Sequence, residues 1–244
     1  AHATRPRTDL VVDKARAGDD PDDNIFKTVT SAAEFAIYGG GGGAGPRPYQ
    51  TIFIKAGTYV ENLYLTHVPI LVLGELGAPE GPVVLSSNVD GNFTVYMDRV
   101  AVLDGITITH APGTTGRGVI CLYYPMDPMG DPSWLKQRRL INCVIRDNTG
   151  YAGGGFEVVG ADLTLAHCTV SGNTSDTSQG PGANVWTGNL ILRNSIVWGN
   201  VNLAGDPAAR QIWVQPGAAL NVTAACPSMI GDVDTGSVPG WVDA

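Results

Sequence analysis

Leu140-Ile141-Asn142-Cys143-Val144-Ile145-Arg146-Asp147-Asn148 occurs in this chain in three related copies, and this repetition decides the fold. The second copy is Leu165-Ala166-His167-Cys168-Thr169-Val170-Ser171-Gly172-Asn173, and the third is Leu192-Arg193-Asn194-Ser195-Ile196-Val197-Trp198-Gly199-Asn200. The interval from the second copy to the third is slightly longer than the interval from the first to the second. A weaker copy lies upstream, in Asp104-Gly105-Ile106-Thr107-Ile108-Thr109-His110. A repeat of about 20 to 50 residues is typical of a solenoid.

Side chains alternate between two sides within each copy, which indicates short strands rather than helices. If each copy stacks on the last, Cys143, Cys168 and Ser195 form one inward row. The neighbouring inward row is Ile108, Ile145, Val170 and Val197. We expect the asparagines at 148, 173 and 200 to lie at a turn, because asparagine tolerates left-handed backbone angles and stacked amides can hydrogen-bond to one another.

A second strand precedes each copy, since the stretch 161–165 recurs as 188–192, at the longer of the two intervals. The two extra residues of that interval therefore belong in the loop after Asn173. An antiparallel sandwich also has short strands separated by turns. Three copies in register favour an all-β solenoid, a parallel β-helix.

Composition limits the class of protein. The chain has 244 residues, a net charge of -8, 43% hydrophobic and 16% charged residues. It can bury a core and is not globally disordered. Its acidic balance argues against nucleic acid as a partner, and no apolar run approaches the roughly 20 residues of a membrane span. The four cysteines lack metal-binding spacing, so we expect neither zinc nor a disulfide framework.

The front half resembles right-handed β-helix proteins of the pectate-lyase-like superfamily. The resemblance rests on Asp9-Leu10-Val11-Val12-Asp13 and on Ile52-Phe53-Ile54-Lys55-Ala56-Gly57-Thr58-Tyr59-Val60-Glu61-Asn62. The back half, through the copies at 163–173 and 195–200, is similar to bacterial surface β-helices of the "choice-of-anchor" kind. The resemblance implies one right-handed parallel β-helix domain over 1–244 and an extracellular or cell-surface location. Because such chains commonly continue beyond the point that 239–244 resembles, it also predicts a fragment or a shortened relative.

Within that domain, residues 1–50 are expected to hold the first strand, a short amphipathic helix at 28–36 and a flexible glycine-rich loop at 39–45. The helix would cap the open end of the coils, which occupy 51–244, and cover unpaired strand edges there.

Aromatic side chains are the first candidates for ligand binding. Trp198 falls on the outward side with Ser171, Arg146 and Thr109, where an indole can stack on a sugar ring and an arginine can pair with a carboxylate or sulfate. Trp198 can equally pack under the loop after Asn200.

The stretch 122–134 interrupts the repeat and carries further ligand-binding candidates, Tyr123, Tyr124 and Trp134. Loops that lengthen one coil are where solenoids build sites. This loop can alternatively cover the sheet locally or contact another chain.

Catalysis by β-elimination from a uronic acid needs a basic side chain and a cation that neutralises the carboxylate. Lys136, Arg138 and Arg146 are of the right type, but the chain lacks the motifs of pectate lyases, pectin methylesterases and polygalacturonases. An acidic loop with Asp19, Asp20, Asp22 and Asp23 could bind calcium, although its spacing is not that of an EF-hand, and a solvated turn is the simpler interpretation. We expect no other cofactor.

Two functions follow from these features. The first is a non-catalytic secreted or surface module that binds carbohydrate, adheres, or assembles with another protein chain. The second is a polysaccharide lyase or related carbohydrate-active enzyme that acts on a uronic-acid polymer.

Overall fold

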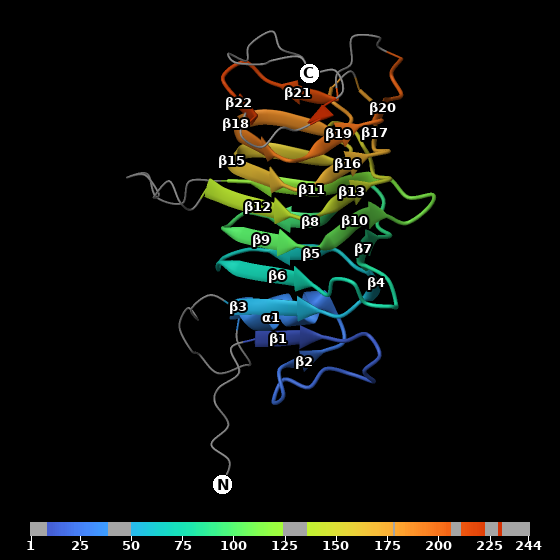
Figure 1. The fold of residues 1–244 in the computed structure, drawn as a ribbon, viewed down its shortest axis with the longest axis vertical. Coiled ribbons are helices and arrows are strands. Elements are labelled where there is room, and N and C mark those ends of the chain that lie inside the picture. Colours follow the sequence, from blue (N-terminus) through green and yellow to red (C-terminus); the bar gives the residue numbers. More distant parts are fainter. Residues whose placement is uncertain are drawn as a thin grey trace.

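The computed structural model describes residues 9–38, 50–123, 136–177, 179–205, 211–222 and 229–230. The chain winds into a right-handed parallel β-helix with one short helix near its N-terminus, which confirms the predicted fold class (Figure 1). The coils are stacked along one axis, from the blue N-terminal strands to the orange C-terminal strands. Nearly all strand pairs between coils are parallel, as the solenoid requires and a sandwich does not.

Each coil has three faces. The first face consists of β1 (Asp9–Val12), β2 (Ile25–Phe26), β3 (Gln50–Ile54), β6 (Ile70–Gly74), β9 (Ala101–Asp104), β12 (Gln137–Ile141), the second halves of β15 (Phe156–Ala166) and β18 (Ala183–Arg193), and β22 (Ala219–Val222). The second face consists of β4 (Gly57–Val60), β7 (Val83–Ser87), β10 (Ile106–His110), β13 (Val144–Arg146), β16 (Thr169–Ser171), β19 (Ile196–Trp198) and β23 (Met229–Ile230). The third face consists of β5 (Leu63–Leu65), β8 (Asn92–Met97), β11 (Gly116–Leu122), the first halves of β15 and β18, and β21 (Ile212–Val214). Three short strands follow the second face in the later coils: β14 (Thr149–Gly150), β17 (Thr174–Ser175) and β20 (Val201–Asn202).

Strand register confirms the predicted repeat. Ile145 pairs with Val170 and Val170 with Val197, and Ile108 pairs with Ile145 across the longest interval. The stretch 161–165 pairs with 188–192, as expected.

The register also locates the two extra residues of the third copy. Gly150 pairs with Ser175, whereas Phe156, in the next strand of the same coil, pairs with Ala183. The later coil therefore has two more residues between these pairs than the earlier one, and they fall after Ser175. This agrees with the predicted loop after Asn173.

The interior of the later coils is built from two stacked rows. Cys143, Cys168 and Ser195 are each 1% exposed, and the backbone N–H of Cys168 donates to Oγ of Ser195 at 3.2 Å. Ile145 and Val170 in the neighbouring row are fully buried. Both inward rows are therefore confirmed. Cys121, Cys143 and Cys168 are free thiols, and burial raises the pKa of Cys121 to about 12.

The predicted asparagine row is also confirmed, but for a different reason than the one expected. The left-handed residue at this turn is the one before each asparagine: Asp147, Gly172 and Gly199 have φ of 57°, 67° and 68°. Asn148 and Asn173 are fully buried instead. Their position under the turn lets each side chain satisfy backbone groups that would otherwise be buried without partners.

The hydrogen bonds of this row run in one direction. The Nδ2 of Asn148 donates to Oδ1 of Asn173 at 2.9 Å, and the Nδ2 of Asn173 donates to Oδ1 of Asn200 at 2.9 Å. The Nδ2 of Asn200 donates to Oε1 of Gln211 at 2.8 Å, so a glutamine ends the row. Asn173 also donates to the carbonyl of Ile145 at 3.0 Å, which ties the row to the coil below.

The predicted helix is present as α1 (Val29–Tyr38), which contacts β1, β2, β3 and β5 and buries Val29, Ala32, Ala33 and Ala36. Thr28 is its N-cap, since the N–H of Ser31 donates to Oγ1 of Thr28 at 3.0 Å. Glu61 completes this end: its carboxylate accepts the N–H groups of Val29 and Thr30 at 3.0 and 2.6 Å. A carboxylate is favourable there because helix N-termini carry partial positive charge. The glycine-rich stretch 39–45 lies outside the described residues.

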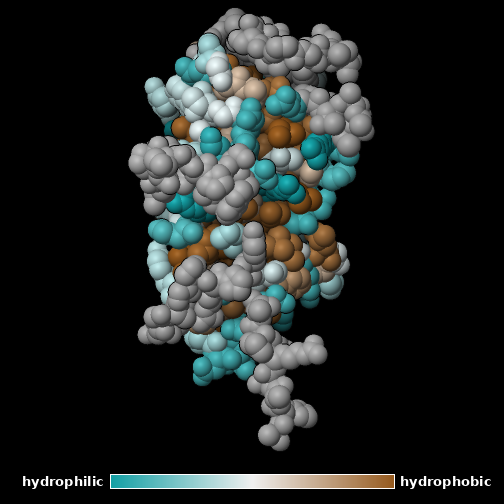
Figure 2. All heavy atoms as spheres, turned by 90° about the vertical axis from the view of Figure 1, so that its left-hand side faces the viewer, coloured by the Kyte–Doolittle hydropathy of each residue, from teal (hydrophilic) through white to brown (hydrophobic). Residues whose placement is uncertain are grey.

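The early coils were expected from the resemblance alone, and the repeat pattern did not reveal them because their outward side chains are apolar. In β3 and β6, Phe53, Leu71 and Leu73 point outward and are partly exposed, so these strands read as continuous hydrophobic runs. Figure 2 shows hydrophobic atoms at the surface between polar ones along the height of the molecule. The alternation that marks the later copies is thus hidden in the first ones.

Replacement of Asn173 by alanine tests the asparagine row. The variant leaves the buried N–H of Asn148 and carbonyl of Ile145 without their partners, so the free energy of unfolding should fall by about 3 kcal/mol. Urea denaturation followed by circular dichroism measures this change. Asn221→Ala, on an exposed position of β22, should change it by less than about 0.5 kcal/mol. Equal effects of the two variants would contradict the structural role of the row.

Stability should depend on pH through His110, which is 4% exposed. Burial lowers the pKa of His110 below its model-peptide value of 6.5. The unfolded state therefore binds a proton that the folded state does not, and stability should fall as the pH drops through about 6.5. The melting temperature should decrease between pH 7.5 and 5.5, and His110→Gln should remove most of that decrease. An unchanged pH dependence in this variant would show that other groups control it.

Candidate functional site

The third face of the coil carries two groups of outward-pointing aromatic side chains, one toward each end. At its N-terminal end Tyr64, Phe93 and Tyr96 form a cluster, with the ring centroids of Tyr64 and Phe93 and those of Phe93 and Tyr96 each 5.2 Å apart. At its C-terminal end Trp186 and Trp213 meet edge to face, with centroids 5.6 Å apart. Six strands, β5 to β21, connect these ends, which corresponds to roughly 24 Å at the spacing of strands in a sheet.

A charged pair lies between the two aromatic groups. Nε of Arg117, on β11, is 3.0 Å from Oε2 of Glu157, on β15, and the two side chains are 26% and 12% exposed. The indole N–H of Trp186 donates to the other carboxylate oxygen of Glu157. Arg117 Nε also donates to the carbonyl of Ala152 at 3.2 Å. Glu157 is thus fixed from both sides and holds the indole of Trp186 in one orientation.

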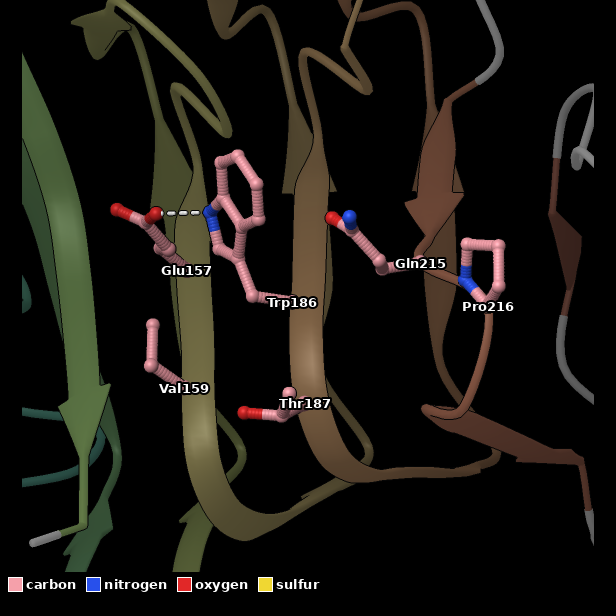
Figure 3. A pocket seen from close by; sticks show the side chains of 6 residues that line it. All are labelled: Glu157, Val159, Trp186, Thr187, Gln215 and Pro216. Atoms are coloured by element: carbon pink, nitrogen blue, oxygen red, sulfur yellow. Dashed lines mark hydrogen bonds between the residues drawn. The ribbon is translucent and has the colours of Figure 1, made fainter.

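A groove of about 480 Å³ lies at this point of the third face. It is lined by Glu157, Val159, Trp186, Thr187, Gln215 and Pro216. Figure 3 shows the indole of Trp186 standing between the carboxylate of Glu157 and the amide of Gln215. An apolar ring surface flanked by a few fixed polar groups is the usual composition of a ligand site.

Gln215 lines the groove with a side-chain amide whose oxygen has no partner among the described residues. Its Oε1 is buried and accepts no hydrogen bond from any residue that the structure describes. A buried acceptor without a partner costs free energy. Rotation of the Gln215 side chain toward the groove would let a ligand group donate to this oxygen and remove that cost.

A β-bulge sets the position of Trp186. β15 and β18 pair in register up to Val158 and Val185, and Val159 then pairs with Thr187, so Trp186 is the extra residue. Both strands next bend from the third face into the first, at Gly160 and Gly188, which have φ of 72° and 94°. Bulges re-aim side chains and are frequent beside functional sites.

The residues predicted on the outer side of the second face lie where the repeat placed them. Trp198 pairs in register with Ser171, and Ser171 with Arg146. Trp198 is 56% exposed, and Arg146 pairs with its neighbour Asp147 at 3.0 Å. Both belong to a face different from the groove, and no ligand contact tests them.

Of the other predicted residues, Arg138 is in the interior, and Tyr123 and Lys136 flank the inserted segment. Arg138 is fully buried and donates to the carbonyl of Leu122 at 2.8 Å, so it does not face an open groove. Burial lowers the pKa of Arg138. Tyr123 is 8% exposed, with Nζ of Lys136 at 5.1 Å and Cζ of Arg138 at 5.8 Å from its ring centroid. Tyr124 and Trp134 lie outside the described residues.

The acidic loop connects β1 to β2. Oδ1 of Asp19 accepts the N–H of Lys27 at 2.6 Å, Oδ1 of Asp20 accepts that of Asp23 at 3.3 Å, and Asp20 pairs with Arg16 at 3.5 Å. Within the described ranges, no three His, Cys, Asp or Glu side chains are grouped so as to hold a metal ion. A calcium ion at Asp19, Asp20, Asp22 and Asp23 stays a prediction. In the same ranges, no helix combines the length and hydrophobicity that crossing a membrane requires.

Comparison with known proteins leaves the family open. No protein-family model matches the chain, and no curated protein matches its sequence. Among solved structures, it is similar to a pectin methylesterase in complex with a hexasaccharide (16% identity, TM-score 0.45, 88% of this chain and 66% of that one). It is also similar to pectin methylesterase PemA from Erwinia chrysanthemi (16%, 0.45, 87% and 64%) and to a pectin methylesterase from Aspergillus niger (16%, 0.34, 98% and 98%). The chain spans about two thirds of the first two structures. At this level of similarity, the fold rests on the strand pairing described above, and the site rests on its own geometry.

The sequence analysis missed the groove, although one signal was present. Trp186 and Trp213 are separated by the same interval as Cys168 and Ser195, the equivalent residues of the second and third copies. Neither tryptophan lies inside a copy, and the charged residues Arg117 and Glu157 are separated by the irregular interval that contains the inserted segment. Only the strand register brings these four residues together.

Loss of the charged pair should destabilise the third face. In Arg117→Ala, the carboxylate of Glu157 stays largely buried without its cation, so the free energy of unfolding should fall by about 2 kcal/mol. Arg146→Ala removes an exposed pair and should cost less than about 0.5 kcal/mol. Urea denaturation of both variants measures the difference. A smaller effect of Arg117→Ala than of Arg146→Ala would contradict the geometry.

Proposed function

We propose that this protein binds a polysaccharide chain along its third face. The observation that carries the proposal is the groove at Trp186, where an indole bonded to a carboxylate lies beside the amide of Gln215. A sugar ring offers an apolar C–H surface for stacking and hydroxyl groups for hydrogen bonds, and this arrangement meets both.

The length of the face favours a chain over a single sugar. Aromatic rings lie at both ends of the six strands, at Tyr64 on β5 and at Trp213 on β21. A parallel β-helix keeps such rings at fixed distances because every strand is hydrogen-bonded to the next. A ligand that contacts both ends therefore pays little ordering entropy on the protein side.

The proposal extends to location and kind of protein. Structural polysaccharides occur chiefly outside the cytoplasm, so we propose an extracellular or cell-surface protein. The likeness of its back half to surface β-helices of the "choice-of-anchor" kind supports this location. Adhesion or assembly with another protein chain would then use the same rigid rod. The exposed Trp198 and Arg146 on the second face are proposed as a second, weaker contact site.

The alternative is a lyase or related enzyme acting on a uronic-acid polymer. Such an enzyme needs a base and a cation that face the same substrate. Lys136, Arg138 and Arg146 do not converge, because Arg138 is buried and Arg146 lies on another face. Incubation with uronate polymers, with and without calcium, tests the lyase through the absorbance of the unsaturated product, and release of reducing ends or of acid tests a hydrolase or an esterase. We expect none.

Tryptophan variants test the binding site. With a panel of neutral and acidic polysaccharides in affinity gels, Trp186→Ala and Trp213→Ala should each weaken binding at least tenfold, because each removes a stacking surface. Tyr151→Ala, which removes a 70% exposed ring outside the groove, should leave binding unchanged. Far-UV circular dichroism verifies that each variant is folded.

Two outcomes would contradict this assignment. If Trp198→Ala abolishes binding while Trp186→Ala does not, the ligand binds the second face. If the wild-type protein binds no member of the panel, the proposed function is wrong.

A further inference from the structure

The charge of the third face differs from that of the chain. The chain carries 15 basic and 23 acidic residues, a net charge of -8. Among the described outward positions of β5, β8, β11, β21 and the first halves of β15 and β18, the charged side chains are Arg117 and Glu157. The remaining outward positions are aromatic, aliphatic or uncharged polar. The described strands of this face therefore carry no net charge on their outward side, in a chain that is acidic as a whole.

The two charges of this face neutralise each other. Nε of Arg117 is 3.0 Å from Oε2 of Glu157, and the second carboxylate oxygen accepts the indole N–H of Trp186. A carboxylate on the ligand would have to compete with Glu157 for Arg117 and would lie beside a second negative charge. Like charges at this separation repel, and the acidic remainder of the protein adds to the repulsion.

The same groups suit an uncharged ligand. The Glu157 carboxylate and Oε1 of Gln215 are hydrogen-bond acceptors, and Oε1 of Gln215 accepts no hydrogen bond from the described residues. Sugar hydroxyls are donors and can satisfy both, while a pyranose face stacks on Trp186. None of these contacts requires a charge on the ligand.

We propose that the groove takes an uncharged polysaccharide, and that the pairing of Arg117 with Glu157 selects against uronic-acid polymers. The inference rests on the proposed function and narrows its substrate class. It identifies Glu157 as a specificity-determining residue: it orients Trp186 and at the same time masks the positive charge that an acidic chain would need.

Salt dependence of binding tests the inference on the wild-type protein. Isothermal titration should be carried out with neutral β-glucan, xylan and mannan oligosaccharides and with oligogalacturonate of similar length. At least one neutral ligand should bind at least tenfold more tightly than oligogalacturonate. Its affinity should change less than twofold between 50 and 500 mM NaCl, because no ion pair is formed.

Glu157→Gln provides the complementary variant. It keeps a hydrogen-bond acceptor for Trp186 but leaves the charge of Arg117 unmasked, so affinity for oligogalacturonate should rise at least fivefold at 50 mM NaCl and fall again at 500 mM. Asp147→Asn is the matched control, since it releases Arg146 from the same kind of pair on the second face. It should leave the affinities for oligogalacturonate and for the neutral ligand unchanged.

The outcomes separate the inference from the proposed function. Tighter binding of oligogalacturonate than of every neutral ligand, lost in Trp186→Ala, would overturn the inference and leave polysaccharide binding at the groove intact. An absence of binding by any ligand would overturn both. If Glu157→Gln does not fold, the comparison of ligands and salt concentrations on the wild-type protein still decides between them.

Discussion

Vertical stacking of equivalent residues is the constraint on which the whole structure depends. A coil of this kind closes only if every buried backbone group finds a partner in the coil above or below. At the turn after the second face this task falls to Asn148, Asn173 and Asn200, whose amides bond to one another and to backbone carbonyls. The left-handed residue before each asparagine forms the turn, and the side chain of the asparagine hydrogen-bonds to the backbone groups buried there. The fixed interior keeps the strands of successive later coils in register on the second face.

Sequence reasoning succeeded where stacking repeats a residue type. Cysteine above cysteine and asparagine above asparagine at nearly constant intervals can be read from the sequence alone, and they predicted the later coils in the correct register. The early coils could not be read this way, because their outward residues are apolar and their intervals differ.

The groove could not be predicted for the same physical reason. Outward residues are free of the packing constraint, so one row of the third face contains Tyr96, Ile120, Glu157, Asn184 and Trp213 with no residue type in common. The interval along the chain between successive members of this row differs at every step. A single bulge then moves Trp186 out of line. Which outward residues contact one another depends on the length of every coil between them. A local sequence pattern does not contain that information.

Function in this account comes from the contrast between a repetitive interior and a varied outer face. The rod fixes the spacing of aromatic rings, and the Arg117–Glu157 pair removes net charge from between them. A crystal structure of the protein with a neutral oligosaccharide tests this account most directly. It predicts sugar rings over Trp186 and beside Glu157 and Gln215. Sugar bound instead at Trp198 on the second face, with the groove free of ligand, would contradict it.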